Sequence, residues 1–136
     1  MGQSVSPDKG TILIVEDEAI VRFHLADLFE DAGYRVREAP HAAAAIAILE
    51  ADRSIGILLT DVDMPGDMDG VRLAHHVRDR YPPTVLLVMS GVATPSPAEL
   101  PARTLFVAKP FDPHRLLDRI AQVTDRDSAG AQGGLL

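Results

Sequence analysis

Reactive polar side chains follow four short apolar runs of this chain. The runs are TILIV (11–15), IGILLT (55–60), TVLLVM (84–89) and TLFVA (104–108), and the side chains that follow them are Glu16, Asp17, Glu18, Asp61, Asp63, Ser90 and Lys109. An acidic cluster attracts a hard cation, and carboxylates together with a carbonyl and waters suit Mg2+. A lysine ammonium would add a second positive point charge. If these side chains converge, their chemistry is that of a cation site with a reactive carboxylate.

The elements that would position these side chains alternate between strand and helix. Apolar spacing and turn signals predict strands at 11–15, 34–38, 55–60, 84–89 and 104–108, and helices at 19–32, 41–52, 71–80 and 113–124, with Asp69 as an N-cap. Such alternation predicts a parallel sheet with helices on both faces, and ligand sites of these sheets lie at the carboxyl ends of the strands. A single polar residue there is ordinary, because strand ends meet water. The whole set favours a site.

Composition limits the class of protein. The 136 residues predict one domain, and the absence of cysteine excludes disulfides, thiolate metal sites and a cysteine nucleophile. The net charge of -7, from 13 basic and 20 acidic residues, weighs against nucleic acid as a direct partner. We expect a soluble, cytoplasmic protein without membrane contact, since the chain has neither a spanning apolar run nor a signal peptide pattern.

Four short motifs resemble the receiver domain of two-component response regulators. They are VEDE (15–18), TDVDMPG (60–66), MSG (89–91) and AKPF (108–111), in order along residues 9–123. The resemblance implies a flavodoxin-like, doubly wound fold of five parallel strands in the order 2-1-3-4-5. The prolines and the leucine before KPF are similar to receivers of alphaproteobacterial type, including those attached to hybrid histidine kinases.

The resemblance also implies roles for individual residues. Asp61 would accept a phosphoryl group from a histidine kinase or a histidine phosphotransfer protein. Mg2+ would be held by Glu16, Asp17, Asp61 and the backbone carbonyl of Asp63, and Lys109 would pair with a phosphoryl oxygen. The protein would then be a signalling receiver, not an enzyme, although it promotes its own phosphorylation and dephosphorylation.

Three further residues would carry the response and its duration. Ser90 resembles the hydroxyl that moves to the phosphoryl group, and Phe106 resembles the aromatic that changes rotamer with it, although it fits equally well as a core residue of the last strand. Asp63 and Val92 occupy positions that tune loss of the phosphoryl group, and an apolar Val92 predicts slow loss. The resemblance further implies a cis peptide bond between Lys109 and Pro110.

The chain departs from the family pattern in two places. The segment MPGDMDG (64–70) is one residue longer than usual, which predicts a bulge near Asp67. The segment from Ser90 to Lys109 is short and carries Pro95, Pro97 and Pro101 where the family has its fourth helix. Since proline inside a helix costs about 3 kcal/mol, that helix should be short, displaced or absent, and the usual dimer through it is not expected.

The predicted organisation is a flexible segment at 1–8, a receiver domain at 9–124 and a flexible tail at 125–136. Met1 and the loose tail favour a complete, stand-alone receiver whose output is a protein contact or onward phosphoryl transfer, without direct DNA binding. The five histidines are expected on the surface, and Arg22 and Ala26 of the first helix are candidates for the docking face of the kinase.

Three alternative functions fit part of the same residue pattern. A haloacid-dehalogenase-type phosphatase would use Asp61 and Asp63 as nucleophile and general acid, but its motif should end the first strand, whereas this one ends the third. An EF-hand loop starting at Asp61 fails at Pro65 and at Arg72, where a glutamate belongs. A receiver fold that binds proteins without phosphorylation is the remaining alternative, and the intact acidic, serine and lysine set favours phosphorylation over it.

Overall fold

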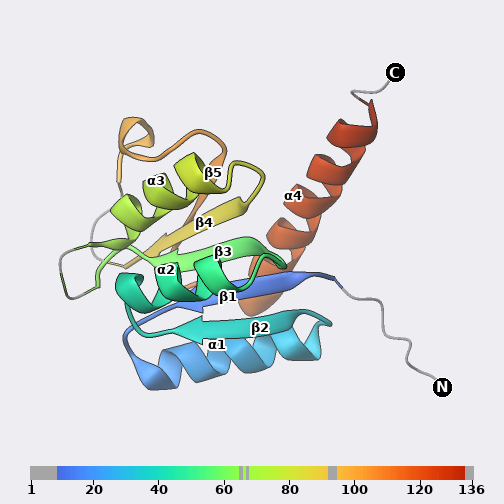
Figure 1. Cartoon of the computed structure of the whole chain (residues 1–136). Coiled ribbons are helices and arrows are strands. Elements are labelled where there is room, and N and C mark those ends of the chain that lie inside the picture. The colour runs from blue at the N-terminus through green and yellow to red at the C-terminus, as the bar shows by residue number, and fades with distance from the viewer. Residues whose placement is uncertain (1–8, 65, 67, 92–94, 134–136) are drawn as a thin grey trace.

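Five strands alternate with four α-helices in the computed structural model, which describes residues 9–64, 66, 68–91 and 95–133 (Figure 1). The strands are β1 (Thr11–Val15), β2 (Arg35–Ala39), β3 (Ile55–Asp61), β4 (Val85–Ser90) and β5 (Thr104–Ala108). The helices are α1 (Ala19–Asp31), α2 (Ala42–Ala51), α3 (Gly70–Arg80) and α4 (Pro113–Gly133), with a 3₁₀ turn η1 at Pro97–Glu99.

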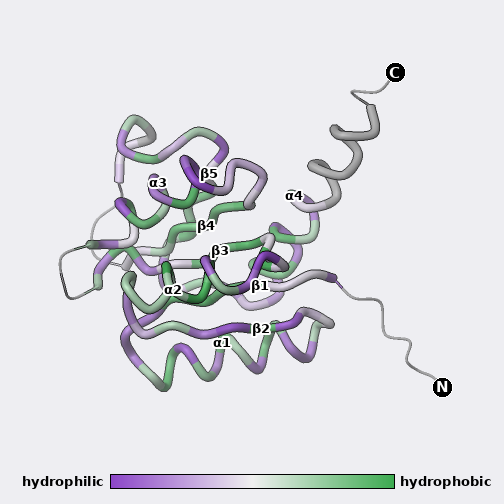
Figure 2. Tube along the Cα trace, viewed as in Figure 1, coloured by the Kyte–Doolittle hydropathy of each residue, from purple (hydrophilic) through white to green (hydrophobic). Residues whose placement is uncertain are grey.

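All neighbouring strands are parallel, in the order β2-β1-β3-β4-β5. The flavodoxin-like architecture and the strand order predicted from the sequence are therefore confirmed. The strands β1 and β4 are buried along their whole length, which explains why they are unbroken apolar runs. The edge strand β2 is mostly hydrophilic, as Figure 2 shows. Because every strand points the same way, all their carboxyl ends meet at one edge of the sheet.

The helices form two layers. One core cluster joins α1 and α4 to one face of the sheet through residues such as Phe29 and Leu116, and a second joins α2 and α3 to the other face through residues such as Leu49 and Leu73. The N-cap predicted at Asp69 is confirmed, because its Oδ1 accepts a hydrogen bond from the backbone N–H of Arg72 at 2.9 Å. This cap fixes where α3 begins, directly after the loop that follows β3.

The connection between β4 and β5 lacks the usual α-helix. Of its described residues, only Pro97–Glu99 are helical, as the single turn η1. This confirms the predicted loss of the fourth helix, and its physical reason is the proline content of the segment. The label α4 therefore belongs to the last helix of the chain.

The predicted end of the last helix at about Thr124 is wrong. The helix continues to Gly133, so residues 125–133 are helical and do not form a loose tail. No proline interrupts this stretch, and the two glycines at 130 and 133 weaken a helix without forbidding it. Residues 1–8 and 134–136, predicted to be flexible, lie outside the described part of the chain.

Candidate functional site at the carboxyl ends of the strands

The acids that follow β1 and β3 converge. Carboxylate oxygens of Glu16, Asp17 and Asp61 all lie within 4.8 Å of one another. Glu16 is fully buried and Asp61 is only 5% exposed, whereas Asp17 is open to solvent. The parallel pairing of β1 with β3 explains the convergence, because it brings the last residues of the two strands side by side.

Lys109 reaches this cluster from the end of β5. Its Nζ lies 2.8 Å from Oδ2 of Asp61 and 3.3 Å from Oε1 of Glu16. Burial alone would lower the pKa of Lys109, but the hydrogen bond and charge of Asp61, followed by those of Glu16, raise it above its usual value. Lys109 is therefore a permanent cation at neutral pH, and it is held directly against the carboxylate of Asp61.

One ammonium does not balance the three carboxylates. Burial raises the pKa of Glu16 to about 7, and the charge of Asp61 adds to the rise, while the backbone N–H of Glu18 and the charge of Lys109 oppose it. The first of these opposing contacts is a hydrogen bond of 3.1 Å to Oε2 of Glu16. Such a cluster of oxygens, with one member open to solvent, has the donor chemistry that Mg2+ takes in proteins.

Arg22 fixes the turn that carries Glu16. Its Nη1 donates to the backbone carbonyl of Glu16 at 2.8 Å, and its Nε pairs with Glu38 of β2 at 3.2 Å. The sequence placed Arg22 on the first helix as a docking residue, but the structure gives it a bracing role beside the site. Only its spacing of six residues from Glu16 could have suggested this contact.

Asp63 links the carboxylate of Asp61 to Ser90. The backbone N–H of Asp63 donates to Oδ1 of Asp61 at 3.1 Å, and the hydroxyl of Ser90 donates to Oδ2 of Asp63 at 3.5 Å. Ser90 is buried and Asp63 is exposed. The sequence prediction assigned Asp63 a backbone carbonyl ligand and a position that tunes loss of the phosphoryl group, but it did not predict the contact of the Asp63 carboxylate with Ser90. This contact places the hydroxyl within reach of the cluster.

Gly70 packs directly against Asp61, and the sequence analysis missed it. A Cβ on Gly70 would lie 1.9 Å from the backbone oxygen of Asp61, and its own N–H donates to the carbonyl of Val62 at 3.0 Å. Any other residue would displace either α3 or the end of β3. The available signal was a glycine directly after the N-cap residue Asp69, because glycine is ordinarily unfavourable inside a helix.

The structure tests some of the remaining predictions for the site and leaves others outside the described residues. Phe106 is half-buried and belongs to neither core cluster, so its interpretation as an ordinary core residue is wrong. The peptide bond between Lys109 and Pro110 is cis, as predicted. Val92, and Asp67 with its predicted bulge, lie outside the described residues.

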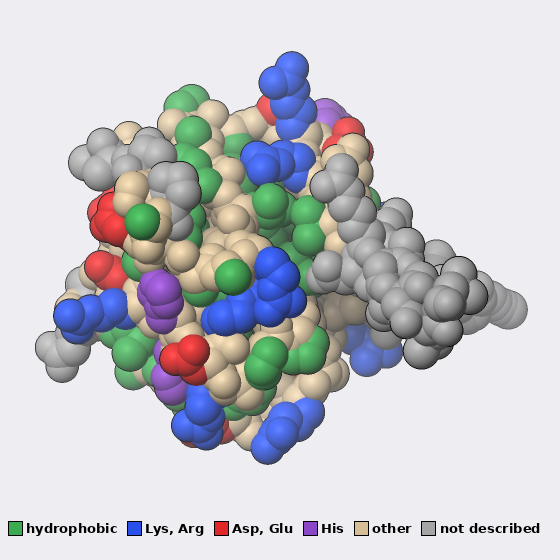
Figure 3. Space-filling model, turned by 90° about the horizontal axis from the view of Figure 1, so that it is seen from above, with side chains coloured by type: hydrophobic (Ala, Val, Ile, Leu, Met, Phe, Trp, Pro, Cys, Tyr) green, Lys and Arg blue, Asp and Glu red, His purple; other side chains and the backbone are tan. Residues whose placement is uncertain are grey.

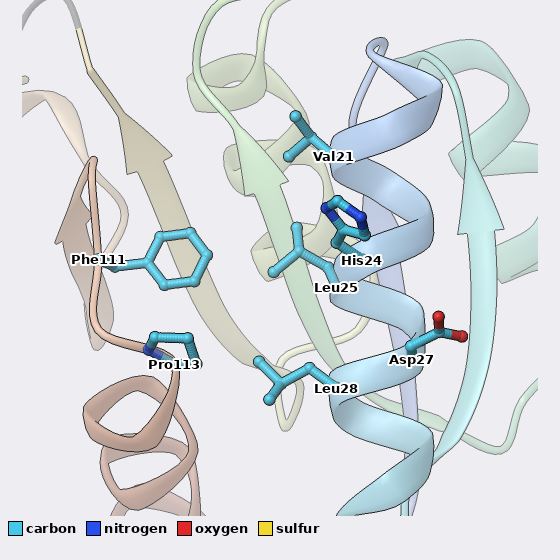
Figure 4. Close-up of a pocket in the computed structure, with 7 residues that line it drawn as sticks. All are labelled: Val21, His24, Leu25, Asp27, Leu28, Phe111 and Pro113. Carbon is cyan, nitrogen blue, oxygen red and sulfur yellow. The ribbon is translucent and has the colours of Figure 1, made fainter.

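A mostly apolar groove lies beside α1 (Figure 4). It runs between this helix and the segment after β5, and Val21, Leu25 and Leu28 face Phe111 and Pro113 across it. On the same helix the large side chains of Ile20 and Phe23 are 71% and 52% exposed, while Ala26 is buried. The expectation that Ala26 contributes to a docking face is therefore wrong, and the exposed apolar pair is the better candidate.

None of the described helices is long and apolar enough to cross a membrane. Among the five histidines, four are exposed and His76 is half-buried, which agrees with the predicted surface positions.

Comparison with known proteins points to one family. A family model for the response regulator receiver domain matches residues 12–121. The chain is 32% identical over 114 residues to response regulator protein FleR of Pseudomonas aeruginosa, covering 82% of this chain and 24% of FleR. It therefore spans about a quarter of the length of that relative.

Two solved structures are similar over nearly their whole length. A response regulator receiver protein from Sinorhizobium medicae has a TM-score of 0.81 and 27% identity, covering 87% of this chain and 96% of the other. The receiver domain of the hybrid histidine kinase CckA has a TM-score of 0.71 and 34% identity, covering 84% and 98%.

Proposed function

Because this chain belongs to the response regulator receiver family, we propose that Asp61 accepts a phosphoryl group from a phosphohistidine of a donor protein. The observation that carries the proposal is the contact of 2.8 Å between Lys109 Nζ and Asp61 Oδ2, at the centre of the acidic cluster. A carboxylate oxygen of Asp61 forms the new O–P bond as the P–N bond of the donor breaks, and the leaving imidazole takes up a proton.

The residues around Asp61 supply position and charge. Phosphoryl transfer depends mainly on in-line placement and on neutralising the three phosphoryl oxygens. The N–H of Asp63 and the ammonium of Lys109 hold the two oxygens of the Asp61 carboxylate at 3.1 and 2.8 Å. During transfer, Lys109 would turn to an oxygen of the incoming group, so that its charge follows the charge that moves.

We further propose Mg2+ as the resident cation, held by Glu16, Asp17, Asp61 and the backbone carbonyl of Asp63. Bound there, Mg2+ supplies the positive charge that phosphoryl oxygens require. The mutual approach of the three carboxylates within 4.8 Å supports this assignment. In a thermal melt, Mg2+ should raise the unfolding temperature of the unmodified protein and have less effect on Asp17→Asn, whereas the exposed Asp118→Asn on α4 should respond like the unmodified protein.

Intact mass after incubation with acetyl phosphate and Mg2+ tests the acceptor. We expect a single phosphoryl adduct in the unmodified protein and in Asp118→Asn, and none in Asp61→Asn or in the presence of EDTA. An adduct that persists in Asp61→Asn would show that another residue is the acceptor. Absence of a phosphoryl adduct with acetyl phosphate and with phosphorylated kinases alike, together with no binding of beryllofluoride, would leave a protein-binding module that acts without phosphorylation.

Ser90 and Asp63 support a simple response to phosphorylation. The hydroxyl of Ser90 bonds the Asp63 carboxylate at 3.5 Å, which is long enough for a phosphoryl oxygen to compete. We propose that Ser90 exchanges this partner for the phosphoryl group and that Phe106 moves with it. With Asp63 and Val92 at the positions that tune loss of the group, we expect slow self-dephosphorylation.

The donor protein is proposed to lie along α1. Ile20 and Phe23 are exposed apolar side chains on the helix that follows the acidic cluster, next to the groove of Figure 4. Replacing Phe23 with alanine should slow transfer from a panel of phosphorylated histidine kinases and leave labelling by acetyl phosphate unchanged. Equal loss with both donors would contradict a docking role.

The output is proposed to be a protein contact or onward phosphoryl transfer by a cytoplasmic signalling protein, without direct DNA binding. We propose no enzymatic activity for these residues beyond the protein's own phosphorylation and dephosphorylation. Profiling of phosphotransfer between the protein and histidine phosphotransfer proteins separates the two outputs, because only a relay moves the group onward.

A further inference from the structure

Arg22 of α1 has a mostly buried side chain beside the acidic cluster. On the face shown in Figure 3, Lys and Arg side chains lie on the surface and are interspersed with acidic ones. The side chain of Arg22 is only 14% exposed, compared with 43% for Arg37 of β2, which also pairs with a carboxylate. Taking a guanidinium out of water is unfavourable unless its contacts compensate the lost hydration. Its contacts should therefore explain why the fold keeps an arginine there.

The contacts of Arg22 connect the carboxyl ends of two strands. Its Nη1 donates to the backbone carbonyl of Glu16, directly after β1, at 2.8 Å, and its Nε pairs with Oε1 of Glu38 in β2 at 3.2 Å. The planar fork of a guanidinium can hold two acceptors in this way. The backbone N–H of Glu16 donates to the carbonyl of Ala39, the last residue of β2, at 3.1 Å. Both polar groups of the Glu16 backbone are therefore tied to β2, one directly and one through Arg22.

The carbonyl that Arg22 holds belongs to the peptide unit between Glu16 and Asp17. Because a peptide unit is planar, fixing its carbonyl also fixes the direction of the N–H of Asp17. Both residues contribute carboxylates to the cluster, whose oxygens lie within 4.8 Å of one another. Asp17 is open to solvent, so the direction of its backbone decides much of where its carboxylate points. Arg22 thus acts on the part of the site that packing restrains least.

We propose that Arg22 is a positioning residue for the cation site and that Glu38 acts through it. The inference rests on the proposed assignment of Mg2+ to Glu16, Asp17 and Asp61. Arg22 holds the turn so that the two carboxylates that follow β1 face that of Asp61. Glu38 aims the guanidinium and offsets its charge, which would otherwise oppose a cation in the cluster.

The sign of the effect separates positioning from simple charge. A positive charge repels Mg2+, so removing an arginine that acted only through its charge would tighten Mg2+ binding. Removing an arginine that holds the metal ligands in place should weaken it, since losing such a support typically costs about tenfold or more in metal affinity. The two roles of Arg22 therefore predict opposite changes in one measurement.

Titration with Mg2+, followed by backbone amide NMR and without a phosphoryl donor, tests this proposal. We expect Arg22→Met to raise the dissociation constant for Mg2+ about tenfold. Arg37→Met is the matched control, because it makes the same change in net charge and breaks an ion pair of 2.7 Å with Asp52, which lies before β3 and not after it. This control should bind Mg2+ as the unmodified protein does. The same spectra show whether each variant is folded.

The second half of the proposal is tested by Glu38→Gln, which keeps the shape of the side chain and removes its charge. It should weaken Mg2+ binding by less than Arg22→Met, because the hydrogen bond from Arg22 to Glu16 can remain. The double variant should bind Mg2+ no more weakly than Arg22→Met alone, since Glu38 acts only through Arg22. Losses that add in the double variant would show that Glu38 acts independently.

Labelling by acetyl phosphate provides a second readout. Arg22→Met should need more Mg2+ for half of the maximal rate, so that labelling is slow at limiting Mg2+, while the rate at saturating Mg2+ stays within about twofold of that of the unmodified protein. A kinase is unsuitable as the donor here, because Arg22 also lies over the exposed ring of Phe23, with its Cζ 5.3 Å from the ring centroid. Transfer from a kinase would therefore mix docking with positioning.

Two results would overturn the positioning role of Arg22. They are Mg2+ binding in Arg22→Met that is unchanged or tighter, and an equal loss in Arg37→Met. Failure of the proposed function looks different, because the unmodified protein would then bind no Mg2+ or form no adduct on Asp61. If the unmodified protein binds Mg2+ and is labelled, and only the comparison of variants fails, the inference about Arg22 fails alone.

Discussion

Two connections leave the carboxyl end of the sheet beside the acidic cluster: α1, which follows β1, and residues 91–103, which follow β4. The first is a regular helix that buries Leu25, Ala26 and Phe29 in the core. The second contains only the turn η1 among its described residues and leaves Phe106 half-buried. Both connections start beside site residues, and the contacts among Glu16, Asp61 and Lys109 are made by residues at strand ends, without an α-helix among the described residues of the second connection.

Phenylalanine residues give the largest expected contrast between the two connections. Phe29 of α1 is fully buried, with the ring of Tyr34 at 5.5 Å, whereas Phe106 lies outside both core clusters. Phe29→Ala should reduce the free energy of unfolding by about 3–5 kcal/mol, and Phe106→Ala by about 1 kcal/mol. Urea denaturation measures both. A loss of similar size in the two variants would mean that the β4–β5 side is covered in solution.

Arginines that hold each connection give the next contrast. Arg78 of α3 donates to the backbone carbonyls of Ala102, Arg103 and Thr84, while Arg22 donates to that of Glu16. Arg78→Met should reduce the free energy of unfolding by about 1–2 kcal/mol, because it removes several hydrogen bonds to backbone carbonyls of a connection that has no α-helix among its described residues. Arg22→Met should cost about 1 kcal/mol and, unlike Arg78→Met, should also slow labelling of Asp61 by acetyl phosphate.

Thermal melts and timed intact-mass measurements on both variants provide these two quantities. Slower labelling in Arg78→Met by the same factor as in Arg22→Met would show that the β4–β5 connection, too, positions the acceptor.

Much of the molecule could be predicted from local sequence. The five strands follow from apolar runs and turn residues, their order follows from the resemblance to the receiver family, and the convergence of Glu16, Asp61 and Lys109 follows from parallel strands. The prolines at 95, 97 and 101 correctly predicted the missing helix.

The rest depended on contacts between residues far apart in the sequence. The hydrogen bonds from Arg78 reach carbonyls 24 and 25 residues away, and no periodicity encodes them. The fit of Gly70 against Asp61 depends on the angle at which α3 meets β3. The half-buried state of Phe106 follows from an element that is missing, whereas its own sequence setting resembles that of any core strand.

Backbone conformation should give a smaller difference in stability between the two connections. The residues concerned are those at which each connection ends. Gly33 follows α1 with φ of 103° and Arg103 precedes β5 with φ of 61°. Gly33→Ala should cost about 1–2 kcal/mol, since a side chain disfavours this region even though a Cβ there would meet only Lys9 at 3.5 Å. Arg103→Gly should stabilise the fold by about 0.5 kcal/mol, because glycine adopts this positive φ without strain. Urea denaturation that finds Arg103→Gly destabilising would indicate that the arginine side chain contributes more than its backbone strain costs.

The connection from β2 to β3, which contains α2, should show the smallest change in unfolding temperature. It serves as a reference for the two connections compared above. It ends at Asp52, whose pKa is lowered below its usual value mainly by the hydroxyl and then by the backbone N–H of Ser54, with the paired Arg37 adding to the effect. A carboxyl whose pKa is lower in the folded state stabilises the fold at every pH above its unfolded value, and loses that contribution as the pH falls through the folded value. The unfolding temperature of Asp52→Asn should therefore lie slightly below that of the unmodified protein at neutral pH, and the two should converge in acid. Asp118→Asn removes the same charge on α4 without these contacts. If the unfolding temperatures of Asp118→Asn and of the unmodified protein also differ at neutral pH and converge in acid, the effect reflects net charge. The end of α2 is then held by packing alone.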